Sequence, residues 1–455
     1  MSELEERELR AAPTRLVGLL RAIGPGIVVI GSIMGSGELI NTPIQAAKFG
    51  FVLLWAVIIS CVIKYFLQVE FGRHALAHNR TPFQAFNQCP GPKISSTSWI
   101  GLTYLVGFTF TMLASSGMLR ATAGLLHELF ALHVVEKTSV DLWSVAVTVL
   151  VLAMLWRDVY RDLEKLITLM VGIFSGSVLI GVCLIQRTEF AITGEQIRSG
   201  LTFSLGPDSE AGAYAVVSLL GALGATANEI FMYPYWILEK GYGRHLGSPD
   251  SPDWTQRTRG WIRVLQFDVA VCTLLATVIT VGYFLMGSAV FFGHGEVPQG
   301  DGVLPRLSAM YTQSFGTWSY AVFIAGAFCT LLSTLVVGIA AGGRMWADML
   351  SSTGLIDGGN LRSRHRTHRT FETVAMTLCL IVGVVLGVTP EKLVIFGQYV
   401  NGVFCTPLLM LAVCWLAFKT DKRVRMNGLT ATLLIASVIV ITACIAGPLL
   451  TSFLN

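Results

Sequence analysis

Long apolar stretches, separated by short polar connections, follow one another along almost the whole chain. Each holds about 20 or more residues, enough for a helix to cross the hydrocarbon core of a bilayer. Helices satisfy their own backbone hydrogen bonds, which lipid cannot do, and the alternating pattern of a transmembrane β-barrel is missing from the sequence. Only 13% of the 455 residues are charged, about half the share in soluble domains. The sequence therefore predicts an all-α polytopic membrane protein.

We predict eleven transmembrane helices, preceded by a cytoplasmic N-terminal tail at residues 1–21. The first span is long and follows about twenty polar residues, so we interpret it as a membrane helix and not as a cleaved signal peptide. The expected spans are 23–48, 51–76, 98–130, 139–158, 163–186, 211–239, 261–292, 317–348, 371–388, 391–418 and 428–452.

Basic residues are unevenly distributed between the predicted loops. With a cytoplasmic N-terminus, most of the 32 lysines and arginines fall in the tail and the inner loops. This bias follows the positive-inside rule. We therefore expect a multi-pass protein of the plasma (inner) membrane, with its N-terminus cytoplasmic and its C-terminus extracellular.

Two predicted spans are interrupted at matching places. The first contains Gly35-Ser36-Gly37-Glu38, and the sixth runs through Gly221–Glu229. Glycine weakens a helix interior by about 1 kcal/mol, so we expect unwound backbone at both points. Each interruption lies in the first span of a five-span unit, and a repeated unit with an odd number of spans must insert upside down.

The chain is therefore expected to contain a 5+5 inverted repeat and one extra helix. Paired interrupted helices are the best pointer in a sequence to a transporter's midplane binding site. The predicted parts are a first repeat at 22–186, an extracellular loop at 187–210, a second repeat at 211–418, and an eleventh helix with the C-terminus at 419–455.

Both interruptions end in a glutamate, Glu38 and Glu229. A carboxylate at the bilayer centre is costly, and two facing carboxylates repel unless a cation lies between them. Hard divalent cations prefer carboxylate, amide and carbonyl oxygens. Alternatively, both glutamates are protonated or pair with Lys64 or Arg120, the two basic residues inside spans. The expected metal ligands are Glu38, Glu229, Asn228, Gly35, Ser36, Ala225, Thr226 and Gln398.

At these residues the sequence resembles the Nramp divalent metal transporters, over roughly residues 22–418. The stretch from Gly24 to Trp55 follows the family pattern, and Ser333 to Gly338 and Gln398 are also similar. The resemblance implies a LeuT-type fold in which helices 1 and 6 are broken.

The departures from the family pattern concern the ligands. The helix-1 motif Asp-Pro-Gly-Asn reads Gly35–Glu38 here, and the helix-6 motif Met-Pro-His-Asn reads Thr226–Glu229. Losing the thioether and gaining a carboxylate hardens the site, and the small residues are expected to widen it. A wide, acidic site of oxygen ligands suits an ion that keeps part of its water, and Mg²⁺ gives up its water reluctantly. In this respect the sequence resembles the magnesium-transporting branch of the family. We expect Mg²⁺ or Mn²⁺ as the transported ion, with Ca²⁺ left open by the ligand chemistry, and no cofactor.

The resemblance also bears on energy coupling. The family's proton-relay positions correspond to Ser116, Leu119, Asn228 and Tyr233, which include no carboxylate or histidine. We therefore expect transport without protons, driven by the membrane potential.

Other polar residues have ordinary expected roles. Asp268 is interpreted as a paired or capped helix-end residue at the membrane edge, with a metal or proton group as the alternative. For Arg120 the simpler expectation is a snorkelling side chain, and the alternative is a pair with an acid that holds a gate closed. Glu70, Arg73 and His74 are expected to be solvated at an inner helix end. Residues 364–369 are expected to form a basic inner loop.

Three other functions remain open: a proton-coupled Mn²⁺/Fe²⁺ importer, a LeuT-type amino-acid or amine transporter, and a channel. The sequence contains no H-E-x-x-H, G-x-S-x-G or phosphate-loop motif, so we do not expect an enzyme. The expected partners are divalent metal ions and the lipid bilayer, with no nucleic acid and no obligate protein partner.

Overall fold

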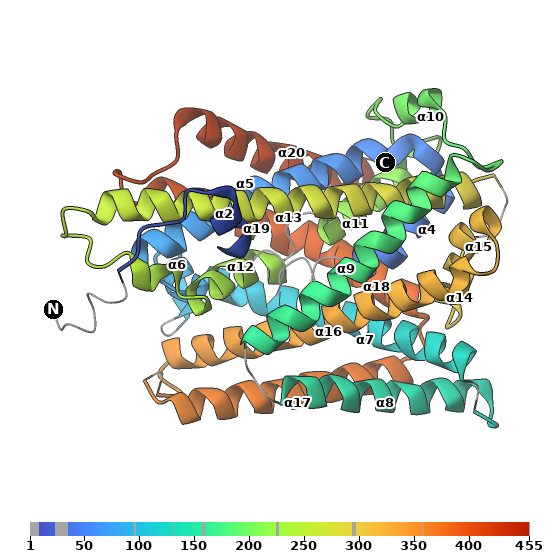
Figure 1. Cartoon of the computed structure of the whole chain (residues 1–455), viewed down its shortest axis with the longest axis horizontal. Helices are drawn as coiled ribbons and strands as arrows, with labels where there is room; N and C mark the ends of the chain where they lie inside the picture. The colour runs from blue at the N-terminus through green and yellow to red at the C-terminus, as the bar shows by residue number, and fades with distance from the viewer. Residues whose placement is uncertain are drawn as a thin grey trace.

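The computed structural model describes residues 9–22, 35–94, 97–130, 132–156, 160–223, 227–293, 297–357 and 359–454. In these ranges the protein is almost entirely helical, with long helices running side by side (Figure 1). One short antiparallel hairpin is present, in which Lys93 pairs with Ser98 and Ile94 with Thr97.

The elements of the first half of the chain follow the predicted spans closely. They are α2 (Leu16–Ala22), η1 (Gly37–Asn41), α4 (Thr42–Phe49), η2 (Gly50–Leu53), α5 (Leu54–His78), α6 (Pro82–Phe86), β1 (Lys93–Ile94), β2 (Thr97–Ser98), α7 (Trp99–Leu129), α8 (Glu136–Leu155), α9 (Tyr160–Ile185) and α10 (Gly194–Ser199).

The second half contains the longest helices. Its elements are α11 (Ser209–Leu223), α12 (Ala227–Glu239), η3 (Tyr242–His245), α13 (Trp254–Phe291), α14 (Val303–Leu307), α15 (Ala309–Phe315), α16 (Ser319–Ser352), α17 (Leu361–Val385), α18 (Pro390–Val400), η4 (Asn401–Cys405), α19 (Thr406–Lys419) and α20 (Gly428–Leu454).

Eight helical stretches within the described ranges are long and apolar enough to cross a membrane, which confirms a multi-pass membrane protein. Shorter apolar helices lie at Ser175–Ile185 and Ser209–Leu223. The eight stretches are Gly37–His78, Trp99–Leu129, Glu136–Leu155, Trp254–Phe291, Ser319–Ser352, Leu361–Val385, Pro390–Lys419 and Gly428–Ile445.

The first stretch turns sharply at Gly50, which separates α4 from α5. Gly50 has φ +61° and ψ −144°, a conformation that side chains disfavour. A Cβ atom there would lie 2.8 Å from the Phe292 ring. The predicted boundary between the first two spans therefore lies at a position where only glycine adopts the required backbone conformation without strain.

The basic segment 364–369 is helical, so the expected inner loop is wrong. α17 begins at Leu361, ten residues before the predicted span. The side chain of Asn360 accepts hydrogen bonds from the backbone N–H groups of Arg362 (3.0 Å) and Ser363 (3.3 Å), which is the chemistry of a helix N-cap. Apolar patterning alone could not find this start, because the first turns are polar.

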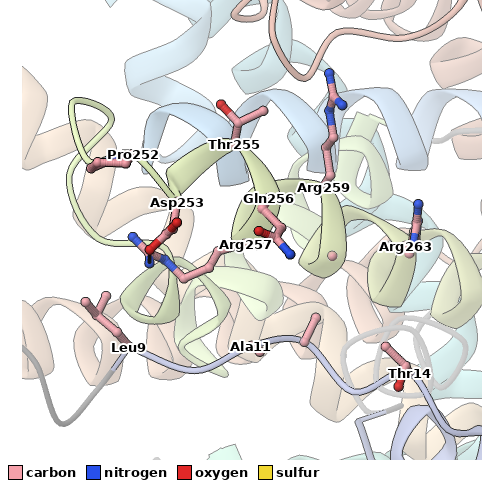
Figure 2. Close-up of a pocket in the computed structure, with 12 residues that line it drawn as sticks. Leu9, Ala11, Thr14, Pro252, Asp253, Thr255, Gln256, Arg257, Arg259 and Arg263 are labelled. Atoms are coloured by element: carbon pink, nitrogen blue, oxygen red, sulfur yellow. Dashed lines mark ion pairs between the residues drawn. The ribbon is translucent and has the colours of Figure 1, made fainter.

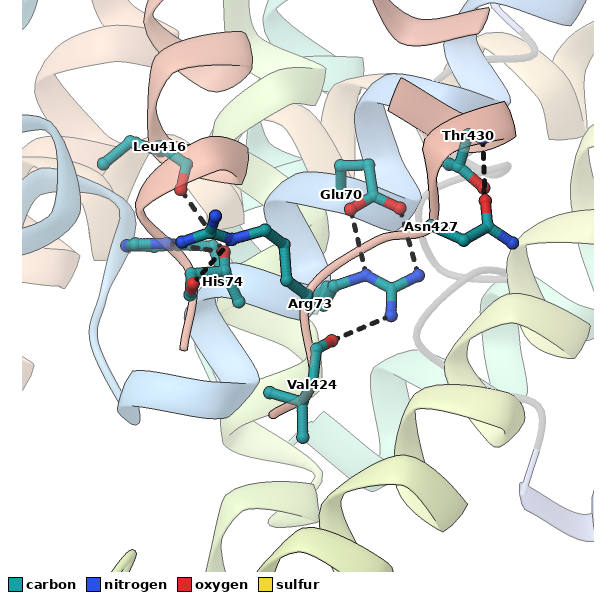
Figure 3. Close-up of polar contacts among 9 residues, drawn as sticks. Glu70, Arg73, His74, Leu416, Val424, Asn427 and Thr430 are labelled. Carbon is teal, nitrogen blue, oxygen red and sulfur yellow. Dashed lines mark hydrogen bonds and ion pairs between the residues drawn. The ribbon is translucent and has the colours of Figure 1, made fainter. Parts of the chain in front are cut away.

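The inner end of α5 is buried, so the expected solvation of Glu70, Arg73 and His74 is also wrong. Their exposed fractions are 0%, 7% and 1%. Arg73 forms two hydrogen bonds with Glu70 (2.9 and 3.1 Å) and donates a third to the Val424 carbonyl (3.1 Å), as Figure 3 shows. The connection between α19 and α20 covers this end of α5 and supplies the missing partners.

The N-terminal segment is held against the start of α13. The indole N–H of Trp261 donates to the Arg10 carbonyl (3.1 Å), and the Tyr242 hydroxyl donates to the Ala22 carbonyl (2.6 Å). Between this segment and α13 lies a pocket of about 780 Å³, lined in part by Leu9 and Arg257 (Figure 2). The chain leading into the first span is therefore attached to the connection that follows α12.

Candidate functional site

Glu38 lies in a wide turn of helix inside the bundle. Its exposed fraction is 1%, and one of its carboxylate oxygens accepts a hydrogen bond from the Gly35 N–H (3.0 Å). The turn, η1, is a π-helix whose closing bond runs from the Thr42 N–H to the Gly37 carbonyl. Single π turns occur frequently at functional sites.

The unwound backbone expected at Gly35–Glu38 is not found there. The chain is helical from Ser36 onward, and the Gly35 carbonyl accepts the Leu39 N–H at 3.0 Å. The irregularity takes the form of a π turn, which keeps backbone hydrogen bonds satisfied in an apolar environment. Residues 23–34, the first half of this span, lie outside the described residues.

Gly35 lies in close contact with Thr334 of α16. A Cβ atom at position 35 would lie 2.2 Å from the Thr334 hydroxyl oxygen. The space expected from the loss of a side chain at this position is therefore filled by Thr334, and the predicted widening at Gly35 is wrong. Thr334 places a further hydroxyl oxygen beside the turn that carries Glu38. The sequence analysis did not identify Thr334 as part of the site.

A buried network of amide and hydroxyl groups lies next to this turn. Gln398 of α18 donates to the Ser36 hydroxyl (3.1 Å) and accepts from the Asn41 side chain (2.8 Å). Asn41 also donates to the Ser218 hydroxyl of α11 (2.9 Å), and Gln45 donates to Asn41 (3.0 Å). The structure thus brings together two of the predicted site residues, Ser36 and Gln398, from opposite ends of the chain.

Asn41, Gln45 and Ser218 were not predicted as part of the site. Each is at most 2% exposed. The signal that could have found the first two is the presence of amide side chains inside an apolar span, where unpaired polar groups are costly.

The second predicted interruption lies between α11 and α12. Gly224, Ala225 and Thr226 lie outside the described residues. Asn228 and Glu229 belong to the first turn of α12, and only their backbone is described. A Cβ atom at Gly37 would lie 3.3 Å from that of Ala222, so η1 packs directly against the last turn of α11.

A basic residue shares the surroundings of Glu38. Lys64, in the middle of α5, is 3% exposed. Cys61, one turn from Lys64 on α5, lies close enough to both Lys64 and Glu38 for their side chains to affect its thiol. Lys64 and Glu38 therefore lie in the same part of the bundle.

Of the described positions that correspond to the family's proton relay, one is hydrogen-bonded to a buried acid and two others are not. Ser116 and Leu119 are buried on α7, where the Ser116 hydroxyl donates to the Met112 carbonyl (2.8 Å). The Tyr233 hydroxyl donates to a carboxylate oxygen of Asp268 at 2.9 Å. Asp268 is fully buried, well inside α13, so its interpretation as a helix-end residue is wrong.

Arg120 pairs with acids instead of snorkelling, so the simpler expectation for this residue is wrong. Its guanidinium donates two hydrogen bonds to Asp301 (both 2.8 Å) and one to Asp141 (2.9 Å). A fourth reaches the Gly383 carbonyl at 3.2 Å. One side chain thus joins α7, α8, α17 and the connection before α14, near the ends of α7 and α17 that are expected to face outward.

A second set of polar contacts joins α12 to α16 near their other ends. Arg344 forms two hydrogen bonds with Glu239 (2.8 and 3.2 Å) and lies 4.7 Å from the centre of the Trp236 ring. One oxygen of Asp348 accepts hydrogen bonds from Tyr235 and Thr81, both at 2.5 Å. Polar contacts therefore join neighbouring helices near both ends of the bundle.

Comparison with known proteins places this geometry in a family. The model of the family described as "Natural resistance-associated macrophage protein-like" (Nramp) matches residues 26–451. A divalent metal cation transporter MntH from Verminephrobacter eiseniae is 23% identical over 431 residues, which covers 94% of this chain and 87% of the relative. The MntH of Acidiphilium cryptum is 22% identical over 457 residues, covering 96% and 93%.

Solved structures agree with the expected fold. A manganese transporter from Eremococcus coleocola superposes with a TM-score of 0.69 at 17% identity, over 96% of this chain and 89% of the other. MhsT in complex with L-phenylalanine gives 0.63 at 15% identity, over 97% and 99%. These likenesses confirm the predicted LeuT-type fold. The chain belongs to the Nramp family.

Proposed function

We propose that this protein is a transporter of divalent metal cations, Mg²⁺ and Mn²⁺, which it binds between helices 1 and 6. The observation that carries the proposal is Glu38, an acid that is 1% exposed in a π turn inside an apolar bundle. A buried carboxylate is costly in such a place unless a cation or proton offsets its charge. The relatives named as divalent metal cation transporters support the same function.

The proposed ligands are Glu38, Glu229, Asn228, Gly35, Ser36, Ala225, Thr226 and Gln398. The donors described near Glu38 are amide and hydroxyl oxygens, including those of Ser36 and Gln398. Hard ions that keep part of their hydration shell prefer such donors to thioether sulfur. Ser36, Asn41 and Gln398 hydrogen-bond one another beside the turn that carries Glu38, and we propose that they exchange these bonds for bonds to the water of a partly hydrated ion.

We further propose that transport is not coupled to protons. The buried residues at two of the family's relay positions, Ser116 and Leu119, do not titrate between pH 5 and 8. An inside-negative potential of 100 mV supplies about 4.6 kcal/mol for a divalent cation. This is enough to accumulate the ion without a second driving ion.

The proposed arrangement in the membrane follows the distribution of charge. The N-terminus lies in the cytoplasm and the C-terminus outside, in the plasma membrane. Two inverted halves, 22–186 and 211–418, rock against each other around the site. The Arg120 contacts then lie on the outer side and the Arg344 contacts on the inner side.

The test is uptake into liposomes under an inside-negative potential, with trapped Mg²⁺-sensitive and pH-sensitive dyes. We expect Mg²⁺ and Mn²⁺ to enter without acidification, and entry to be lost in Glu38→Ala and in Glu229→Ala. A matched control is Glu136→Ala, which removes an exposed glutamate from the start of α8 and leaves uptake unchanged. Entry of Mn²⁺ or Fe²⁺ alone, accompanied by acidification, refutes the proposal.

A specific contact favours a second candidate, proton-coupled import of Mn²⁺ or Fe²⁺. Asp268 is a fully buried carboxyl group bonded to Tyr233, which occupies a relay position of the family. In that case the liposome interior acidifies as the metal enters, and this acidification disappears in the Asp268→Asn variant. If Asp268 is only structural, Asp268→Asn leaves the ratio of protons to metal ions unchanged.

A further inference from the structure

A groove of about 870 Å³ runs along the side of the bundle between α7, α16 and α17. It is separate from the candidate metal site. Phe108 and Phe110 of α7 line one wall, and Trp346 and Leu350 of α16 contribute to its floor. Along the third wall, its lining residues on α17 extend from Ser363 to Val382, about 28 Å of helix. The groove is therefore nearly as long as the bilayer core is thick.

The groove is polar at one end and apolar along the rest. Ser363, Arg366, Thr367 and Thr370 line it in the first turns of α17. From Phe371 onward the lining consists mainly of apolar side chains, which on α17 are Phe371, Val374, Ala375, Leu378, Cys379 and Val382. This order, a charged end followed by an apolar channel, is complementary to a phospholipid.

The apolar part is open toward the outside of the bundle. Val374 and Leu378 line the groove, and each is 51% exposed. α17 and α8 lie along one edge of the molecule, where no further helix of the described chain covers α17 (Figure 1). In a bilayer, an acyl chain can enter from this side without crossing a polar barrier.

The positive charge at the polar end is available to a ligand. Arg366 is exposed and makes no ion pair in the described part of the chain. Arg362 precedes it by four residues, so both lie on one face of the helix, and Arg362 is exposed as well. Arg369 is engaged differently, since it donates to the Trp156 carbonyl at 3.2 Å. In the proposed orientation, this end of α17 faces the cytoplasm, whose leaflet carries anionic lipids.

We propose that this groove binds one anionic phospholipid of the inner leaflet. Arg366 and Arg362 hold the phosphate, the hydroxyls of Ser363 and Thr370 bond to its oxygens, and an acyl chain lies against Phe371, Val374 and Leu378. A bound lipid also contacts Trp346, two residues from the Arg344 that joins α16 to α12. Because Trp346 also stacks against Phe371 of α17, with ring centres 5.7 Å apart, the lipid stabilises the contact between α17 and α16.

The test is native mass spectrometry of the purified full-length protein with dioleoylphosphatidylglycerol or dioleoylphosphatidylcholine, which share their acyl chains. We expect one retained phosphatidylglycerol, bound at least tenfold more tightly than phosphatidylcholine. Arg366→Gln should weaken phosphatidylglycerol binding roughly fivefold, and Arg362→Gln/Arg366→Gln roughly 25-fold. The matched control is Arg263→Gln, which removes an exposed arginine from α13 on the same side and leaves binding unchanged.

A second pair of variants tests the acyl-chain part without altering charge. Val374→Trp fills the apolar groove, whereas Val385→Trp places the same residue at a position of α17 that is 72% exposed and outside the groove. We expect the Val374→Trp variant to lose the bound lipid and the Val385→Trp variant to keep it. Equal binding of the two lipids, equal effects of Arg366→Gln and Arg263→Gln, or a protein dimer that disappears in Val374→Trp would each overturn the proposal. Because binding is measured without transport, these outcomes are independent of the proposed function.

Discussion

The contact between Gly35 and Thr334 predicts a graded series of glycine-to-alanine substitutions. A new Cβ atom would lie 2.2 Å from Thr334 at position 35 and 3.3 Å from Ala222 at position 37, and would touch nothing within 4 Å at Gly338 of α16. For Gly35→Ala, the two groups must separate by roughly 1.2 Å to reach ordinary contact at 3.4 Å. Such overpacking costs about 1–3 kcal/mol.

The three variants should therefore change the free energy of unfolding by different amounts, and not all in the same direction. Gly35→Ala lowers the free energy of unfolding by about 1–3 kcal/mol. Gly37→Ala changes it by less than about 1 kcal/mol, because a shift of a few tenths of an ångström relieves the contact. Gly338→Ala stabilises by roughly 0.5–1 kcal/mol, because alanine is the better helix former.

Thermal unfolding in detergent measures the order of the three midpoints, and Mn²⁺ uptake shows whether the turn carrying Glu38 has moved. Thr334→Ala removes the hydroxyl and methyl groups but leaves the Cβ atom, 2.8 Å from the new one. The double variant Gly35→Ala/Thr334→Ala should therefore recover part of the lost stability. If Gly35→Ala unfolds at the same temperature as Gly338→Ala and transports normally, the close approach of η1 to α16 is refuted.

Three further outcomes follow from buried polar groups. Arg120→Gln leaves Asp301 and Asp141 without their partner and should cost about 3 kcal/mol in thermal unfolding, more than Asp141→Asn; equal losses would contradict the shared pairing. Burial raises the pKa of the Cys89 thiol to about 12, so the thiol stays protonated up to pH 9 and should resist maleimide until the protein is denatured; rapid labelling of the native protein at pH 8 would argue against this. Asn41→Leu leaves buried oxygens without a donor and should lower the free energy of unfolding by about 1–3 kcal/mol, measured against Gln256→Leu at an exposed position of α13.

The membrane-spanning architecture could be predicted because apolar stretches of the required length are explicit in the sequence. The end of the first span at Phe49 was predicted within one residue, since Gly50 marks the turn. The start of α17 was missed, because its cap and first turns consist of polar residues that resemble a loop. Helix formation in those turns depends on Asn360, a local signal that hydropathy does not register.

The polar residues were harder to place, because their partners are distant in sequence. For Arg120 an acidic partner was only the alternative to snorkelling and could not be named, because Asp301 lies 181 residues away in the chain. Glu70 and Arg73 were recognised, but the segment that buries them comes from the region of Val424. In the candidate site, Ser36 and Gln398 were both predicted, whereas the role of Asn41 as the link between them depends on geometry that a sequence does not contain.

The network around Asn41 also has a consequence for how the protein is made. Asn41 bonds to Ser218 and Gln398, which follow it by 177 and 357 residues. At about 5–20 residues per second, synthesis of the last partner takes roughly 20–70 s longer than synthesis of Asn41. During that time the amide groups of Asn41 and Gln45 have neither of these partners. Other partners must therefore satisfy these amide groups in the meantime, and the network of the candidate site is completed only late in biogenesis.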